Sequence, residues 1–361
     1  KNNMRVCILG NGLSGLTLAK ALVNIKIFVD VMPSKKSFQL NKSRTLGISK
    51  SNLEFFNNKI INIAKIIWKL KKIDIFSDNL KNEKLLNFEN KKDQLFSILK
   101  NSELYNILDK SLKRNKYFKM ININEKKTFL ESYDIVISTD YSSPITKKYF
   151  TKKILKKYDS FAHTTIIEHK KIINDTATQI FTKKGPLAFL PISKNNTSIV
   201  YSIHNLNNNV KENINQLIRK YNLKYKIKKI NKIETFDLKS CMLRNYYHGN
   251  ILAFGDLIHR IHPLAGQGFN MTIRDIKILV SIIKSKIELG LDLDNSINVE
   301  FQNYSKHKNF IFSNGIDYIY EFFNYDGKIK NNLLVNSLKY VGSKNSINNM
   351  LKKIADTGLN Y

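Results

Sequence analysis

Residues 5–30 read RVCILGNGLSGLTLAKALVNIKIFVD: an apolar run, three glycines spaced as GxGxxG, an amphipathic segment and a second apolar run. This order predicts a buried strand, a tight turn, a helix and a second strand. Gly10 permits the turn, Gly12 lets a pyrophosphate approach the backbone, and Gly15 lets the helix pack on the strand. Asp30, in the second strand, stands where an acidic group can hydrogen-bond an adenosine ribose. A chance glycine turn is the alternative, because GxGxxG alone is a weak signal.

A second informative stretch, residues 250–275, reads NILAFGDLIHRIHPLAGQGFNMTIRD and holds the densest run of glycine, aspartate, histidine and proline in the chain. Its apolar run Ile251–Phe254 predicts a buried strand. The strand stops at Gly255 and Asp256, and a carboxylate at a strand end would point into a cleft. Asp256 is therefore a candidate for holding a hydroxyl group of a ligand.

A loop and a helix follow this strand. Pro263 stiffens the loop, and Gly266, Gln267 and Gly268 expose bare backbone. Apolar residues at helical spacing then predict a helix over residues 270–282. Backbone N–H groups at the start of a helix lack partners and lie at the positive end of the helix dipole. The start of this helix would therefore attract electron-rich atoms of a ligand.

Residues 255–270 follow the pattern GD-x-x-H-x-x-HP-x-x-GQG-x-N. This pattern resembles the signature of the group A flavin-dependent aromatic hydroxylases, particularly the branch that hydroxylates ring intermediates in ubiquinone biosynthesis. The resemblance implies that Asp256 binds the ribityl chain of FAD and that the segment from Pro263 to Gly268 lies beside the flavin ring. The cofactor-binding residues implied in this stretch are Gly255, Asp256, Pro263, Gly266, Gln267, Gly268 and Asn270.

Two further segments resemble family elements that contact the cofactor. Ser43–Ser49 is similar to the loop after the second strand, whose arginine, here Arg44, lies near the flavin. The tetrapeptide at residues 101–104, NSEL, opens a predicted helix and resembles the Asn-Arg-x-Leu element of the family. The resemblance places Asn101 at the cofactor, whereas Ser102 replaces the usual arginine.

Tyr133–Thr139 is a further apolar run and predicts a buried strand that ends at Asp140. In the family this position carries Gly-Ala-Asp-Gly, and its aspartate, here Asp140, helps to bind FAD and the nicotinamide cofactor. Tyr141 replaces the last glycine. A bulky side chain at this place would hinder the close approach of a pyrophosphate or demand an altered turn.

Short β-branched runs alternate with polar turns between Tyr158 and Ile203, which predicts an antiparallel sheet. Within it, Gln179–Phe181, Gly185–Pro191 and Ser198–Val200 resemble the ubiquinone branch more closely than they resemble other flavin hydroxylases. These segments are expected to belong to a substrate domain.

The fold class implied by the resemblance is α/β: a Rossmann-like FAD-binding domain of the glutathione-reductase type, an inserted and mainly antiparallel β-sheet substrate domain, and a C-terminal helical region. We expect the FAD-binding domain to be discontinuous. The expected ranges are 1–75, 95–157 and 246–295 for the FAD-binding domain, 76–94 and 158–245 for the substrate domain, and 296–361 for the helical region.

Composition limits the class of protein. The chain has 361 residues, of which 42% are hydrophobic, enough for a substantial core. It has no run of 18 apolar residues and no apolar signal region at its start, so we expect a cytoplasmic protein, with peripheral contact to the inner face of the cytoplasmic membrane as an option. Cys7 and Cys241 form neither a metal motif nor a disulfide framework.

The formal net charge is +31, from 60 basic and 29 acidic residues. Such an excess can indicate a nucleic-acid or anionic-membrane partner. Here the excess is mostly lysine, spread from end to end, as expected when a biased genome replaces arginine by lysine. A nucleic-acid binder should instead cluster its charge with aromatic or arginine side chains, so we expect no nucleic-acid partner. Weak attraction to anionic lipid is compatible with either interpretation.

Two other patterns have alternative interpretations. Asp256, His259 and His262 are three residues apart and would share one face of a helix, as metal ligands can. Gly255 and Pro263 bracket them too closely for a long helix, and no fourth ligand suggests itself, so we expect structural histidines and no metal. A C-terminal apolar cluster either caps the core or contacts a membrane surface; it consists of Ile311, Ile316, Ile319, Tyr320, Phe322 and Phe323.

The resemblance implies an FAD-dependent monooxygenase. Such an enzyme would use NAD(P)H and O2 to hydroxylate the aromatic ring of a polyprenyl phenol or quinol in ubiquinone biosynthesis, by way of a flavin C4a-hydroperoxide. The sequence identifies no catalytic acid or base. Partner proteins of a ubiquinone-biosynthesis complex are an open option. The alternative is a non-catalytic subunit of the same fold that binds FAD or a prenyl lipid, prompted by Ser102 and Tyr141.

Overall fold

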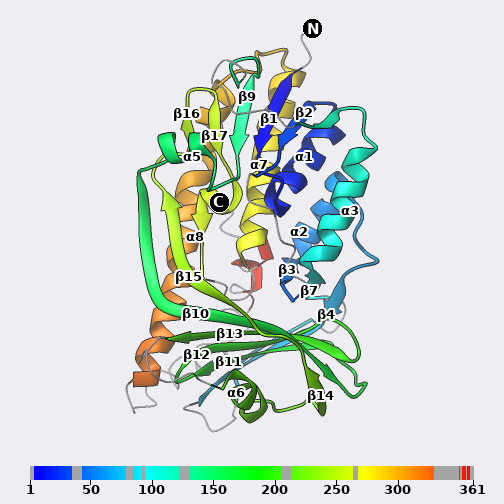
Figure 1. The fold of residues 1–361 in the computed structure, drawn as a ribbon, viewed down its shortest axis with the longest axis vertical. Coiled ribbons are helices and arrows are strands. Elements are labelled where there is room, and N and C mark those ends of the chain that lie inside the picture. Colours follow the sequence, from blue (N-terminus) through cyan, green and yellow to red (C-terminus); the bar gives the residue numbers. More distant parts are fainter. Residues whose placement is uncertain are drawn as a thin grey trace.

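The computed structural model describes residues 4–34, 43–78, 84–90, 94–121, 130–204, 213–262 and 267–328, with residues 349, 352–354 and 356–357. Within this part of the chain, a mostly parallel sheet with helices packed against it forms one half of the molecule, and a large, mostly antiparallel sheet forms the other (Figure 1). The long helix α8 (Ser296–Lys328) runs beside both halves (Figure 1). This arrangement confirms the predicted α/β class with a second, antiparallel sheet.

The first sheet has the strand order β16-β17-β9-β1-β2-β8, and β16 alone pairs antiparallel. Its strands are β1 (Arg5–Leu9), β2 (Phe28–Met32), β8 (Phe118–Met120), β9 (Ile135–Ser138), β16 (Tyr247–His248) and β17 (Ile251–Ala253). The helices that pack with this sheet are α1 (Leu13–Asn24), α3 (Asn101–Lys113) and α7 (Gln267–Glu288). The predicted strand, helix and strand of residues 5–30 are therefore present, as is the helix predicted from residue 270.

Both faces of β1 are buried, which explains its continuous apolar sequence. Val6 and Ile8 join the core formed with α1, α3 and α7, and both are fully buried. Cys7 and Leu9 point to the opposite face, into a smaller core with Val136. Parallel strands buried on two faces bring their carboxyl ends to one edge of the sheet, and that edge is where an α/β fold binds ligands.

The second sheet has the strand order β18-β15-β10-β13-β12-β11-β5-β6, and β14 pairs with β10 off this path. Its pairs are antiparallel except for β5 and β11, which run parallel. The strands are β5 (Lys72–Ser77), β6 (Lys84–Glu89), β10 (Lys153–His169), β11 (Thr176–Thr182), β12 (Gly185–Pro191), β13 (Asn196–His204), β14 (Ile227–Ile230), β15 (Glu234–Leu243) and β18 (His259–Arg260). One face carries an apolar core that includes Ile199 and Tyr201 and packs against α6 (Ile214–Lys220).

A third, three-stranded sheet has the strand order β3-β7-β4 and lies between the two halves (Figure 1). It consists of β3 (Thr45–Ser49), β4 (Trp68–Leu70) and β7 (Phe96–Lys100). The remaining short elements are α2 (Lys50–Phe55), the π-helix η1 (Phe56–Ile60), α5 (Pro144–Tyr149) and the 3₁₀ helix η3 (Gly255–Leu257).

The expected domain ranges can be compared with these elements. β5 begins at Lys72, so the boundary expected at residue 75 falls inside a strand of the second sheet. β10 begins at Lys153, five residues before the expected start of the substrate domain. α8 begins at Ser296, where we expect the C-terminal helical region. The domain ranges themselves stay a prediction.

The apolar cluster expected on the C-terminal helix divides into two parts. Tyr320 is buried and packs with Ile316 against Tyr158 of β10, as a core cap would. Ile311 and Ile319 are each 47% exposed. The side chain of Phe323 lies outside the described residues, and no helix among the described residues has both the length and the apolar character needed to cross a membrane.

Candidate cofactor site

The glycine turn after β1 has no space for side chains. Gly10 has a φ of +107°, and a Cβ atom there would lie 2.6 Å from the Oγ1 atom of Thr139. A Cβ atom on Gly15 would lie 2.4 Å from the carbonyl oxygen of Gly10. The turn therefore requires glycine at both positions, because a left-handed backbone excludes a side chain at Gly10 and close packing excludes one at both.

Helix α1 begins directly after this turn without a cap. Its N-cap residue is Gly12, which has no side chain to cap the helix, and the first turn contains no acidic residue. The first N–H groups of the helix are thus available to a ligand at the positive end of its dipole. This arrangement suits a pyrophosphate.

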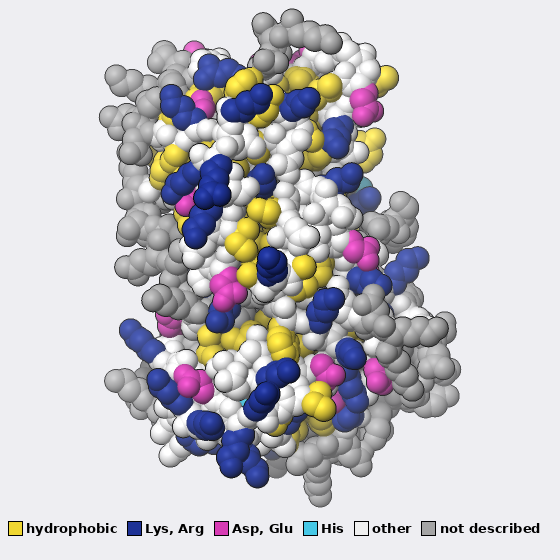
Figure 2. Space-filling model, turned by 90° about the vertical axis from the view of Figure 1, so that its right-hand side faces the viewer, with side chains coloured by type: hydrophobic (Ala, Val, Ile, Leu, Met, Phe, Trp, Pro, Cys, Tyr) yellow, Lys and Arg dark blue, Asp and Glu magenta, His cyan; other side chains and the backbone are white. Residues whose placement is uncertain are grey.

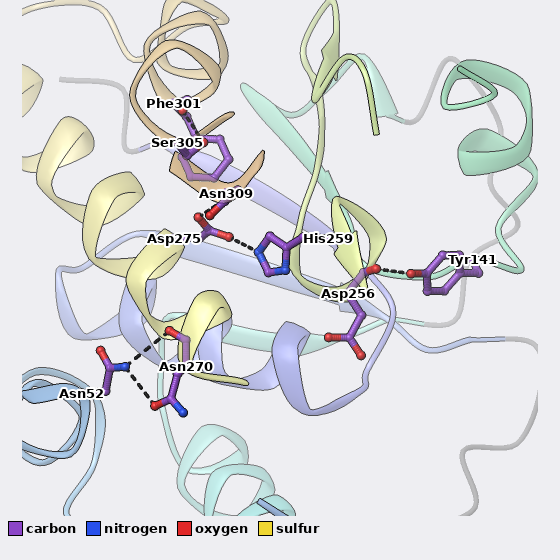
Figure 3. Close-up of polar contacts among 9 residues, drawn as sticks. All are labelled: Asn52, Tyr141, Asp256, His259, Asn270, Asp275, Phe301, Ser305 and Asn309. Carbon is purple, nitrogen blue, oxygen red and sulfur yellow. Dashed lines mark hydrogen bonds and ion pairs between the residues drawn. The ribbon is translucent and has the colours of Figure 1, made fainter. Parts of the chain in front are cut away.

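Asp140 lies beside the glycine turn, because a Cβ atom on Gly10 would be 3.1 Å from the Cβ atom of Asp140. Its Oδ1 atom accepts hydrogen bonds of 2.8 Å from both the backbone nitrogen and the hydroxyl of Ser142. The next residue, Tyr141, is 40% exposed and donates a hydrogen bond from its hydroxyl to the backbone oxygen of Asp256 (Figure 3). The tyrosine that replaces the family glycine thus joins the ends of β9 and β17.

Asp256 follows β17 in η3, against the start of α1. Gly255 has a φ of +66°, and a Cβ atom there would lie 2.8 Å from the Cβ atom of Ser14. The side chain of Asp256 is exposed, and its carboxylate has no hydrogen bond or ion pair within the described part of the chain. Figure 3 shows this carboxylate pointing away from Tyr141. The carboxylate is therefore free to accept hydrogen bonds from ligand hydroxyl groups.

Helix α7 is fixed to β3 and α2 by the fully buried side chain of Asn270. Its Nδ2 atom donates to the carbonyl oxygen of Gly47 at 3.1 Å, and its Oδ1 atom accepts from the backbone nitrogen of Ser49 and from Asn52, each at 2.9 Å (Figure 3). Asn270 thus positions the helix start and has little hydrogen-bonding capacity left for a ligand.

The other predicted residues around the start of α7 differ in their surroundings. Gln267 is buried, whereas a Cβ atom on Gly268 would meet no atom of the described residues within 4 Å. Pro263 and Gly266 lie outside the described residues.

Arg44 and Asn101 meet at the neighbouring ends of β3 and β7. The backbone nitrogen of Asn101 donates to the carbonyl oxygen of Arg44 at 3.1 Å. The side-chain Oδ1 atom of Asn101 is buried and has no hydrogen-bond partner among the described residues. Because buried polar atoms nearly always have partners, this oxygen is a candidate acceptor for a ligand donor.

The structure does not bring Asp30 to the glycine turn. One of its carboxylate oxygens accepts hydrogen bonds from Arg5 at 3.2 Å and from the hydroxyl of Tyr133 at 2.6 Å. These partners lie at the amino ends of β1 and β9, the opposite edge of the sheet from the glycine turn. Burial and the hydrogen bond to Asp30 raise the pKa of Tyr133. This geometry does not support the predicted contact between Asp30 and a ribose.

A buried polar group whose partners the sequence did not indicate joins β18 to the two long helices. The Nε2 atom of His259 lies 2.5 Å from the Oδ2 atom of Asp275, and each side chain is 1% exposed (Figure 3). Asn309 of α8 donates to the other carboxylate oxygen at 3.0 Å. Burial alone would lower the pKa of His259, but the carboxylate of Asp275 outweighs it and raises that pKa. No local pattern relates these residues, which are 16 and 34 positions apart.

The histidines do not form a metal centre with their neighbours. Within the described ranges, no group of three His, Cys, Asp or Glu side chains is placed to hold a metal ion. The ring of His262 stacks on the ring of Tyr320, with 4.1 Å between the ring centroids, and packs edge-on against the ring of Tyr158, with 5.1 Å between the centroids. His262 thus links the segment before Pro263 to α8 and β10.

The site residues fit FAD at several independent points. An uncapped helix start follows a turn that requires glycine, and Gly255, the neighbour of Asp256, lies against Ser14 in the first turn of that helix. The Asp256 carboxylate has no partner within the described part of the chain. Among the described residues, the buried oxygen of Asn101 lacks a hydrogen-bond partner and Gly268 has no neighbour within 4 Å of an added Cβ atom. A dinucleotide offers a pyrophosphate, ribityl hydroxyls and a flat ring to these groups.

Comparison with known proteins agrees with this geometry. The model of a family described as FAD binding domain matches residues 162–288. "Ubiquinone biosynthesis monooxygenase COQ6, mitochondrial" of Dictyostelium discoideum is 29% identical over 114 residues, 31% of this chain and 22% of that protein. "3-demethoxyubiquinol 3-hydroxylase" of Escherichia coli (strain K12) is 29% identical over 154 residues, 40% of this chain and 39% of that protein. Over these segments the chain is similar to an FAD binding domain and to two proteins named as a monooxygenase and a hydroxylase.

The chain also shares its fold with solved structures. The crystal structure of p-nitrophenol 4-monooxygenase PnpA from Pseudomonas putida DLL-E4 superposes with a TM-score of 0.75 at 11% identity, covering 97% of both chains. At that identity the likeness concerns the fold alone. The matched segments span 22% and 39% of the two curated relatives.

Proposed function

We propose that this protein hydroxylates the aromatic ring of a polyprenyl phenol or quinol intermediate of ubiquinone biosynthesis, using NAD(P)H and O2 with FAD as cofactor. The observation that carries the proposal is the meeting of the glycine turn, the start of α1 and the free carboxylate of Asp256 at one edge of the first sheet. The substrate class is supported by similarity to one protein named as a ubiquinone biosynthesis monooxygenase and to one named as a demethoxyubiquinol hydroxylase.

The residues that would hold FAD follow from the contacts of the site. The N–H groups after Gly12 would bind the pyrophosphate, and Asp256 would accept hydrogen bonds from ribityl hydroxyls. Gly268 would let the flavin ring approach the backbone at the start of α7. When bound, FAD supplies the redox chemistry that activates O2 for ring hydroxylation.

The second sheet offers a surface for the aromatic ring. Its face toward the FAD-binding half is identified by two contacts: Thr164 of β10 lies 3.2 Å from the hydroxyl of Ser43, and Ser198 of β13 lies 2.9 Å from that of Thr45. Ala188 of β12 is on the same face, because Ala188 and Val200 are register partners and so are Val200 and Thr164. Small side chains at these positions would leave room for a flat ring.

Two apolar clusters flank this central part of the sheet. Tyr158, Phe181 and Leu238 form one, and Leu70 and Ile98 are the centre of the other. Apolar surroundings would exclude water from the reacting ring and from the flavin. We assign no catalytic acid or base, and the chemistry would rest on the position of the ring and on backbone N–H donors at the start of α7.

A prenylated substrate also requires access to a membrane. The outward side chains of α8 include Phe310, Ile311 and Tyr318, which are 47%, 47% and 70% exposed. Apolar side chains beside lysines would favour peripheral contact with an anionic bilayer. We therefore include peripheral membrane contact in the proposal, together with partner proteins of ubiquinone biosynthesis.

A second candidate function is a non-catalytic subunit that binds FAD or a prenyl lipid. It is favoured by the contact between Tyr141 and Asp256, because the tyrosine occupies the position where the family has glycine beside the nicotinamide cofactor. This candidate keeps the FAD site and lacks turnover.

One experiment separates the two candidates. The purified, FAD-loaded protein is given NADH or NADPH, isotopically labelled O2 and a phenol with a short prenyl tail, and the products are analysed by mass spectrometry. The proposal expects one labelled oxygen atom in the ring for each NAD(P)H consumed. Retention of FAD with neither NAD(P)H consumption nor ring oxygenation would contradict the hydroxylase and favour the non-catalytic subunit.

A further inference from the structure

A second pocket lies outside the cofactor site, between the start of β10, the end of β15 and the middle of α8, with a volume of about 660 Å³. Its size is in the range of small-molecule sites. None of the residues placed around the glycine turn, Asp256 or the start of α7 lines it. It is therefore a separate cavity, on the side of α7 where Asp275 meets Asn309 of α8.

The polar part of the pocket is basic. Arg244 and Lys306 line it, and no aspartate or glutamate does. Neither cation has an ion-pair partner within the described ranges. Amide side chains, among them Asn245 and Asn303, complete the polar wall. Two unpaired cations with neutral hydrogen-bonding groups around them form a site for an anion.

The rest of the wall is apolar. Met242 and Leu243 of β15 are buried at its base, 8% and 4% exposed. Ile154 and Phe310 stand at its rim, 40% and 47% exposed. A ligand that used the whole pocket would therefore carry an apolar body as well as an anionic group.

His259 adds an independent sign of a ligand. It lines the pocket, is 1% exposed, and is held by Asp275 through Nε2. Its other ring nitrogen, Nδ1, is buried and has no partner among the described residues. Nearly all buried polar atoms in proteins are hydrogen-bonded, to a ligand or water where no protein group is available. His259 also pairs through β18 with Met242, so the open nitrogen and the apolar base belong to one structural unit.

We propose that this pocket binds a small amphiphilic anion, a molecule with a carboxylate or phosphate head and an apolar body. Arg244 and Lys306 receive the head, and Met242, Leu243 and Phe310 contact the body. This site is distinct from the one for the aromatic ring, and the proposal does not depend on the reaction that the protein catalyses.

Isothermal titration calorimetry of the FAD-loaded protein tests the proposal. The probes are decanoate, decyl phosphate, neutral decyl glucoside and AMP, each below its micelle concentration where it forms micelles. The proposal expects saturable binding of decanoate, decyl phosphate or both, and the better of the two identifies the head group. Binding of the glucoside as tight as that of the anions, binding of AMP alone, or no binding of either amphiphilic anion would overturn it.

Matched variants locate the site. In the double variant R244Q/K306Q the affinity for the better anion should fall at least about tenfold, since two charge-assisted contacts are lost. K308Q, on the same helix but outside the pocket wall, should bind as the wild type does. Flavin content and thermal midpoint show that each variant is folded. Equal loss in K308Q, or unchanged affinity in R244Q/K306Q, would overturn the assignment to this pocket.

Discussion

At the scale of single residues, the exposed carboxylate of Asp256 has no protein partner in the described part of the chain, so its removal should affect the ligand and not the fold. We predict that Asp256→Ala lowers the affinity for FAD about tenfold or more, because hydrogen bonds to a charged acceptor are lost. Flavin absorbance per protein after dialysis measures this. Asp292→Ala, another exposed aspartate, is the control. Equal flavin content in the two variants would remove Asp256 from the cofactor site.

The ring and the hydroxyl of Tyr141 can be tested separately for their effect on flavin reduction. Its hydroxyl donates to the backbone oxygen of Asp256, and its ring stands where the family has glycine. We predict that Tyr141→Gly retains FAD and is reduced faster by NAD(P)H, since the obstruction to the nicotinamide is gone. Tyr141→Phe keeps the ring and should be reduced at the wild-type rate. Stopped-flow reduction rates that are equal in wild type and Tyr141→Gly would show that the ring is no obstruction.

The pair of His259 and Asp275 makes stability depend on pH. The pKa of His259 is raised in the folded protein, so the pair contributes full stability below the unfolded pKa of about 6.5 and loses it as the pH rises through the folded pKa. We predict that Asp275→Asn lowers the free energy of unfolding by about 3 kcal/mol at pH 6 and by less at pH 9. Urea unfolding with saturating FAD measures both values. A loss of unfolding free energy that is equal or larger at pH 9 would contradict the charged pair.

At the scale of elements, η3 and the start of α7 make different demands on their glycines. Gly255 has a left-handed φ and faces Ser14, whereas a Cβ atom on Gly268 would meet none of the described residues within 4 Å. We predict that Gly255→Ala destabilises the FAD-free protein by about 2 kcal/mol and that Gly268→Ala does not. With FAD present, Gly268→Ala should bind the cofactor more weakly, because its methyl group would meet the flavin. Thermal unfolding without FAD and an FAD titration separate the two effects, and equal unfolding midpoints would contradict the strain at Gly255.

Local sequence pattern predicts those elements whose buried residues all lie within one continuous segment. β1, α1, β17 and α7 follow from apolar runs and glycines, and the structure has all four. The parallel pairing of β5 with β11 joins strands about a hundred residues apart, and no local period indicates it. The side chain of Asp30 shows the same limit, because Tyr133, which holds it, is 103 positions away.

The candidate site was predictable to a similar degree. A short motif indicates the glycines and Asp256, since each role depends on the backbone next to it. Asn270 was predicted at the site, yet its side chain fixes α7 to β3 and α2. The contact between Tyr141 and Asp256 joins two strand ends 115 positions apart, which only the folded sheet brings together.

At the scale of the whole molecule, basic side chains are spread over the face in Figure 2 among apolar and neutral ones. No single stripe follows a groove on that face, which agrees with the interpretation of the +31 charge as a general enrichment in lysine. Charged side chains that bind a specific ligand are then expected in local clusters. Lys306 of α8 and Arg244, which have no ion-pair partner in the described part of the chain, are the example on which our second site depends.

The central claim is that the two halves of one dinucleotide are held at one sheet edge, the pyrophosphate by the start of α1 and the flavin end by Asp256 and the start of α7. A crystal structure with bound FAD tests it most directly. We predict pyrophosphate oxygens within hydrogen-bond distance of the backbone after Gly12 and ribityl hydroxyls within reach of the Asp256 carboxylate. FAD bound elsewhere, or with its ribityl chain away from Asp256, would contradict the account.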